Sequence, residues 1–229
     1  ALLLNHTLPS PYFLLLIYLS TIVYYTYAYL QESKTVVFNE RAGWYKKRYT
    51  YLKIRQIFFT AFCFYIAIVK LNLASIFFTA TYFIKLILLF TGFLSLGYYL
   101  PDFKIPILRT YRTKGILKSL AIAWVWTILC YFMPVWLGSE NNLIITSSKF
   151  YIYFIQFYLF VLVLAILFDI KDINKDQKEL VHTIALHLGG EKTVKQIVAP
   201  LSLLYYLFVI YSVIFLHMHP AFLFLQASL

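Results

Sequence analysis

Long apolar runs alternate with polar segments along the whole chain, and the runs have the length of membrane-spanning helices. The hydrocarbon core of a bilayer is about 30 Å thick, and a helix needs roughly 20 apolar residues to cross it. The stretches that approach or reach this length are 11–30, 54–70, 74–97, 118–137, 148–168 and 196–216. They are too long for strands, and the short alternating segments of a transmembrane barrel are absent from the sequence. We therefore predict an all-α, polytopic transmembrane helical bundle with six complete spans.

Both ends of the chain also carry apolar residues. Ala1–Leu4 has the composition of the tail of a preceding helix, and Pro220–Leu229 that of the start of another. We expect partial helices at both ends of a single transmembrane domain that covers residues 1–229.

Composition excludes a soluble enzyme. Apolar residues make up 62% of the chain and charged residues 13%, and the mean hydropathy is +0.77; soluble domains are about 45–50% apolar and about 25% charged. The net charge of +11 is typical of cytoplasmic loops that face anionic lipid headgroups, so we expect membrane lipids as partners and no nucleic acid. Cys63 and Cys130 both lie in apolar runs, which argues against a disulfide framework.

The basic residues predict the orientation in the membrane. Seventeen of the twenty lie in or directly beside the connecting segments 31–53, 98–118 and 169–195, whereas the alternate connections hold only Lys70 and Lys149. By the positive-inside rule we expect the three basic segments to be cytoplasmic. An inner or plasma membrane is the expected location.

Lys85 and Gln156 are polar residues that lie near the middle of predicted spans. Lys85 lies about ten residues from either end of the run 74–97; it either contacts an anionic lipid or a partner chain, or extends along a tilted helix to the surface. For Gln156 we expect a hydrogen bond between helices rather than a place on a substrate path.

Three aspartates follow the apolar run 148–168. If that helix continues for two turns, Asp169, Asp172 and Asp176 fall within roughly 60° of one another. Carboxylates so close repel unless a hard cation such as Mg²⁺ lies between them. The alternative is a solvated helix end, on which the neighbouring lysines neutralise the acids.

The residues that follow the aspartates extend this pattern. The spacing D-x-x-D-x-x-x-D, then Thr183 and Leu188-Gly189, resembles the second aspartate-rich motif of the UbiA superfamily of intramembrane prenyltransferases. Tyr98-Tyr99-Leu100-Pro101 is similar to the Tyr-x-x-Pro loop of that family. The resemblance implies that the domain lacks a first helix and one or two last helices.

The resemblance also implies a chemistry. In this family aspartate-rich motifs hold Mg²⁺ on the diphosphate of an isoprenoid donor; the diphosphate leaves, and the isoprenoid chain is transferred to an acceptor. It implies metal ligation by Asp169, Asp172 and Asp176. It further implies diphosphate binding by basic residues, namely Arg41, Lys104, Lys118 and Lys175. The catalytic residues are not assigned.

The first aspartate-rich motif of the family has no counterpart here. The stretch 24–34, where it would fall, contains four tyrosines and no aspartate, and Glu32 is its only carboxylate. Two functions therefore stand open: a prenyltransferase that binds an isoprenoid diphosphate, and a catalytically degenerate UbiA-like protein that serves as a structural or accessory subunit beside partner membrane subunits. A transporter or channel has less support, because Lys85 is the one charge in the middle of a predicted span.

Overall fold

The computed structural model describes residues 10–35, 40–99, 115–138, 147–178 and 183–216, and every element within them is a helix. Contacts divide the chain into two compact units. The N-terminal unit is Pro9–Ile87, and the C-terminal unit begins at Leu88, within helix α5. The predicted single domain stays a prediction.

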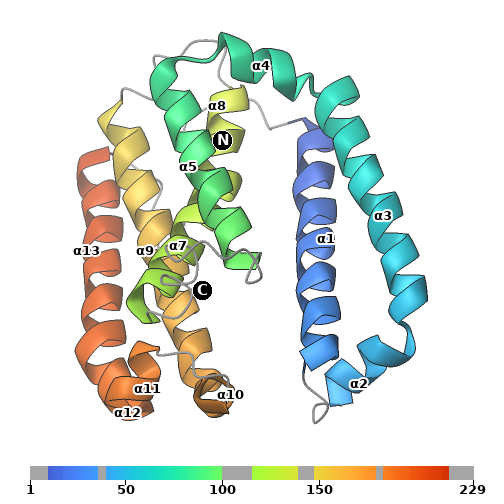
Figure 1. Cartoon of the computed structure of the whole chain (residues 1–229). Coiled ribbons are helices and arrows are strands. Elements are labelled where there is room, and N and C mark those ends of the chain that lie inside the picture. Colours follow the sequence, from blue (N-terminus) through green and yellow to red (C-terminus); the bar gives the residue numbers. More distant parts are fainter. Residues whose placement is uncertain (1–9, 36–39, 100–114, 139–146, 179–182, 217–229) are drawn as a thin grey trace. The chain divides into compact units, whose positions relative to one another are not determined.

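The N-terminal unit is a helical hairpin. Helices α1 (Pro11–Thr35) and α3 (Tyr49–Tyr65) run side by side, and the short helix α2 (Glu40–Lys47) joins them at one end (Figure 1). Leu52 is fully buried in this hairpin, and the Gln56 side-chain amide donates a 2.6 Å hydrogen bond to the carbonyl oxygen of Val23. These contacts fix the register of α3 against α1.

The predicted span at 74–97 is not one continuous helix. A π-helical turn η2 (Ile66–Lys70) ends the α3 segment, and the chain then forms α4 (Leu73–Thr79) and α5 (Tyr82–Tyr99). Ala80 between them has an extended backbone. The Thr79 hydroxyl donates to the carbonyl of Ser75, and the Lys85 ammonium donates to that of Phe78 at 2.8 Å. The Lys85 bond satisfies the Phe78 carbonyl, which is one of those that the end of α4 leaves without a helical partner, so the break needs no glycine or proline.

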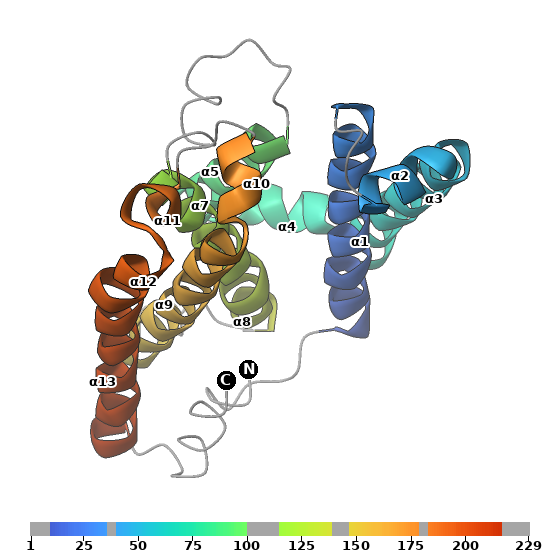
Figure 2. The same ribbon diagram turned by 90° about the horizontal axis from the view of Figure 1, so that it is seen from below.

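In the C-terminal unit the central helix α9 packs between the α7 and α13 segments (Figure 2). The buried residues Ala123, Leu162, Ile166 and Val198 form the core where these three segments meet. Short helices gather beyond the end of α9. The elements are α7 (Gly115–Thr127), η3 (Ile128–Phe132), α8 (Met133–Gly138), α9 (Ser148–Lys171), α10 (Ile173–Lys178), α11 (Ile184–Leu188), α12 (Gly190–Thr193), η5 (Val194–Val198) and α13 (Ala199–Leu216).

Two of the long helices in this unit contain a proline without breaking. Proline lacks the backbone N–H that would bond to the carbonyl four residues earlier. Pro134 and Pro200 each lie two residues after a π-helical turn, η3 and η5 respectively. A local widening of this kind lets the freed backbone groups find other partners, which is why membrane-spanning helices tolerate proline.

Five helices are long and apolar enough to cross a membrane, among the residues that the structure describes. They are Pro11–Leu30, Tyr49–Lys70, Leu117–Gly138, Ser148–Lys171 and Gly190–Leu216, and the part of α5 at Tyr82–Leu96 is a shorter apolar helix. The chain is therefore a helical integral membrane protein. The predicted partial helices at 1–4 and 220–229 lie outside the described residues.

Candidate functional site

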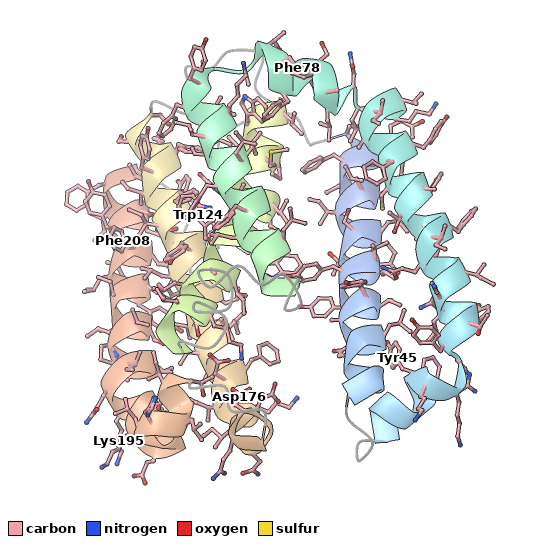
Figure 3. The ribbon with its side chains drawn as sticks, in the orientation of Figure 1. Tyr45, Phe78, Trp124, Asp176, Lys195 and Phe208 are labelled. Carbon is pink, nitrogen blue, oxygen red and sulfur yellow. The ribbon has the colours of Figure 1, made fainter. Side chains whose placement is uncertain are left out.

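A buried cluster of charged side chains joins α7, α9 and α10 at one end of the C-terminal unit (Figure 3). The Lys118 ammonium nitrogen lies 2.8 Å from Oδ1 of Asp169 and 3.7 Å from Oδ2 of Asp176. The side chain of Lys118 is only 14% exposed, and those of the two aspartates are 8% and 6% exposed. One lysine from α7 therefore holds two carboxylates from consecutive segments.

Two hydroxyl groups complete the cluster. Ser119 donates a 2.6 Å hydrogen bond to Oδ2 of Asp169, so both oxygens of that carboxylate have partners. Thr183, fully buried, forms a side-chain hydrogen bond with Asp176 and also caps α11 by accepting a hydrogen bond from the backbone N–H of Leu186. Oδ2 of Asp176 is buried and has no hydrogen-bond partner within the described part of the chain.

The three aspartates do not share one helical stripe, because α9 does not continue for the two further turns that such a stripe requires. Helix α9 ends at Lys171, and Asp172 occupies the C-cap position with backbone angles of −95° and 10°. The chain turns there into α10, which brings Asp176 back toward Asp169 around Lys118 and leaves Asp172 exposed. The two buried aspartates meet through tertiary structure rather than through helical spacing.

The surroundings of Asp176 disfavour its ionised form. Burial is the largest cause, and it raises the pKa of this carboxyl above its usual value. The negative charges of Asp169 and Asp172 raise the pKa further, whereas the Lys118 charge and the Thr183 hydrogen bond lower it. The net effect is a raised pKa, so the cluster carries one carboxylate that is easily protonated.

A pH dependence of stability follows from the raised pKa of Asp176. Between the ordinary carboxyl pKa and the raised value, the folded state binds a proton that the unfolded state releases, so this group makes the fold more stable as the pH falls through the raised pKa. We expect wild-type protein to be less stable than Asp176→Asn at neutral pH and to approach it on acidification. Unfolding in mixed detergent micelles over a pH series measures this, and Glu191→Gln, which removes a charge away from the cluster, should keep the wild-type pH profile. A constant difference between wild type and Asp176→Asn contradicts the expectation.

Of the four predicted diphosphate-binding residues, the structure places the side chain of Lys118 alone at the aspartates. Lys104 lies outside the described residues, and Arg41 and Lys175 lie in α2 and α10 with side chains outside the described part. Lys85 lies near the start of α5 rather than in the middle of a span, bonded to the Phe78 carbonyl and 5.4 Å from the Tyr82 ring centroid.

The cluster fits an internal ion pair better than a magnesium site. Mg²⁺ requires oxygen ligands in near-octahedral geometry, and an ammonium group already lies between the two buried carboxylates. Among the described side chains no three of His, Cys, Asp and Glu come together in a group that could hold a metal ion. Magnesium binding by Asp169, Asp172 and Asp176 stays a prediction.

The structure confirms the predicted contact of Gln156 and adds two hydroxyl contacts that were not predicted. The predicted interhelical hydrogen bond of Gln156 is confirmed, because its amide donates to the Phe208 carbonyl at 2.7 Å and to the Ser212 hydroxyl. The roles of Ser119 and Thr183 as hydroxyl partners of the aspartates were not predicted. A hydroxyl next to Lys118 in the sequence was the available signal for Ser119, whereas Thr183 reaches Asp176 only because the chain turns after α9.

Comparison of the chain with protein-family models, with curated proteins and with solved structures finds no match.

Proposed function

We propose that this protein is a catalytically degenerate, UbiA-like integral membrane protein that serves as a structural or accessory subunit of a membrane complex. The observation that carries the proposal is the Lys118 ammonium between Asp169 and Asp176. A dication at the same carboxylates would meet the positive charge of Lys118 and would have to displace it. The cluster instead ties α7, α9 and α10 together.

The tyrosine-rich end of α1 supports the same conclusion. In the stretch 24–34, where the resemblance would place a first aspartate-rich motif, aromatic side chains contact one another and α2. The ring centroids of Tyr25 and Tyr29 are 6.3 Å apart, and those of Tyr29 and Tyr45 are 5.2 Å apart. Aromatic rings packed in this way stabilise a helical hairpin and supply no ligand for Mg²⁺.

The contacts of Lys118 also support the predicted orientation. Lys118 lies in the first turns of α7 and Asp169 at the last turn of α9, so the basic segments 98–118 and 169–195 adjoin the same end of the C-terminal unit. The positive-inside rule places such an end in the cytoplasm. Within the proposal, this end faces the cytoplasm from an inner or plasma membrane.

A second candidate function is Mg²⁺-dependent prenyl transfer from an isoprenoid diphosphate. It is favoured by the spacing of the three aspartates and by Oδ2 of Asp176, which is buried and lacks a hydrogen-bond partner within the described residues. If this function is correct, Lys118 must move from the carboxylates when metal binds.

Binding of a prenyl diphosphate separates the two functions. The measurement is binding of farnesyl diphosphate to the purified full chain, with and without Mg²⁺, for wild type and for Asp169→Asn/Asp172→Asn. The proposal predicts no saturable Mg²⁺-dependent binding in either protein, together with stoichiometric membrane partner chains when the wild type is purified from native membranes under mild conditions. Glu191→Gln serves as the control for loss of a carboxylate outside the cluster, because Glu191 is exposed and pairs with Lys195 instead of Lys118. Saturable Mg²⁺-dependent binding that the double variant loses and the control keeps would overturn the proposal.

A further inference from the structure

Basic side chains crowd the turn between α2 and α3 in the N-terminal unit. We define the basic corner as the five residues Lys46, Lys47, Arg48, Lys53 and Arg55. All but Arg55, which is half-buried, are exposed. No acidic residue occurs anywhere in the sequence between 41 and 101, so the chain offers the corner no acidic neighbour within this long stretch.

The corner lies where a membrane-spanning helix begins. The apolar span Tyr49–Lys70 starts within it, and the exposed Trp44 comes just before it on α2. The Arg48 guanidinium lies 4.6 Å from the centroid of the Trp44 ring, and that of Arg55 lies 5.9 Å from the ring of Phe59. Tryptophan is enriched at the boundary between lipid and water, and long basic side chains near helix ends extend to the same level. The charges are therefore at the depth of lipid headgroups.

Apolar surface continues directly from the charges along α3. Tyr51, Ile54, Ile57 and Phe58 are each more than 60% exposed and lie within the span. A ligand that contacts both the basic corner and this apolar surface must contain an anionic group and long apolar chains. A phospholipid with an anionic headgroup contains both, whereas a free phosphate ion or an acidic peptide contacts only the charges.

The other described basic segment lacks this excess of charge. Residues 169–195 contain five basic and five acidic residues, and two of the basic side chains already pair with acids or rings. Lys195 lies 2.7 Å from Glu191, and the Lys171 ammonium lies 6.0 Å from the centroid of the Phe168 ring. This segment therefore provides a comparison with the same number of basic residues but a different net charge.

We propose that the basic corner is a binding site for the headgroups of anionic phospholipids in the leaflet where α3 begins. Several basic residues next to a membrane-spanning helix attract anionic lipid, and the attraction weakens with salt. Binding there holds the α1–α3 hairpin at a fixed depth. The site depends on insertion in a membrane and is independent of whether the protein is an enzyme or a subunit.

Quenching of Trp44 fluorescence by brominated lipid tests the site. The full chain is reconstituted in phosphatidylcholine vesicles that contain equal mole fractions of either brominated phosphatidylglycerol or brominated phosphatidylcholine. The difference in signal between wild type and Trp44→Phe isolates Trp44 from the other tryptophans. We expect stronger quenching by the anionic lipid, a decline of this preference with salt, and no competition by soluble glycerol phosphate at comparable concentration.

Matched variants assign the preference to the corner. Lys46→Gln/Lys47→Gln/Arg48→Gln should reduce the preference for anionic lipid at least about fivefold, whereas Lys171→Gln/Lys192→Gln/Lys195→Gln removes three positive charges elsewhere and should retain it. Lys46→Arg/Lys47→Arg keeps the charge and should also retain the preference for anionic lipid. This variant shows whether the effect of the glutamine variants comes from the lost charge or from a folding defect. Equal quenching by the two lipids in wild type, or an equal loss in both triple variants, would overturn the proposal. Displacement of the lipid by an acidic peptide would overturn it too, in favour of a protein partner.

Discussion

Replacement of Lys118 by methionine is expected to lower the free energy of unfolding by about 3–5 kcal/mol, which is the usual cost of removing one partner from a buried ion pair. Methionine keeps most of the apolar length of the side chain but leaves Asp169 and Asp176 buried together without a counter-charge. The two carboxylates then repel each other across the joint between α7, α9 and α10. Unfolding of the purified protein in mixtures of dodecyl maltoside and SDS measures the loss.

The cause of that loss can be separated from simple loss of packing. Because protonation removes the repulsion, the destabilisation of Lys118→Met should shrink as the pH falls. It should shrink in the same way at neutral pH when Asp169→Asn and Asp176→Asn are added. Lys195→Met is the control: Lys195 also pairs with a carboxylate, but its side chain is 72% exposed, so its loss should cost less than about 1 kcal/mol. A pH-independent loss in Lys118→Met would contradict the ion-pair account.

Hydrophobic length predicted most of the helices, because a bilayer imposes that length directly. The runs at 11–30, 118–137 and 148–168 correspond closely to helical spans of the structure. The run 74–97 shows the limit of the method. Hydropathy reports the solvent around a segment, whereas the break at Ala80 depends on local contacts such as the hydrogen bond from Lys85 to the Phe78 carbonyl. Hydropathy averaged over a sequence window contains no information on such individual hydrogen bonds.

The candidate site was predictable in its residues but not in its geometry. The aspartates 169 and 176 and Lys118 were all singled out from the sequence, yet the lysine was expected to bind a diphosphate. A distance of 50 residues separates the hydrogen-bonded pair Ser119 and Asp169, so their pairing depends on how α7 packs against α9. Helical periodicity describes only one element at a time. It groups the three aspartates on one face only if the helix continues, whereas α9 ends at Lys171.

Truncation of Leu52 to alanine should destabilise the hairpin of the N-terminal unit strongly. Leu52 is fully buried in the first turn of α3, and loss of a buried leucine side chain costs about 2–5 kcal/mol, depending on how far the cavity collapses. Cleavage of the α2 region by a protease after reconstitution, together with unfolding in mixed micelles, measures the loosened hairpin.

Ile54→Ala is the matched control for Leu52→Ala, because Ile54 lies two residues away on the same helix and is 64% exposed. It removes a similar volume from a surface that faces the membrane, where no cavity forms, so the cost should stay below about 1 kcal/mol. If α3 is instead buried against another chain on that face, Ile54→Ala becomes as costly as Leu52→Ala in the native complex but not in the purified chain. The pair of variants thus tests the packing inside the hairpin, and the same comparison in native membranes tests whether a partner subunit covers the outer face of α3.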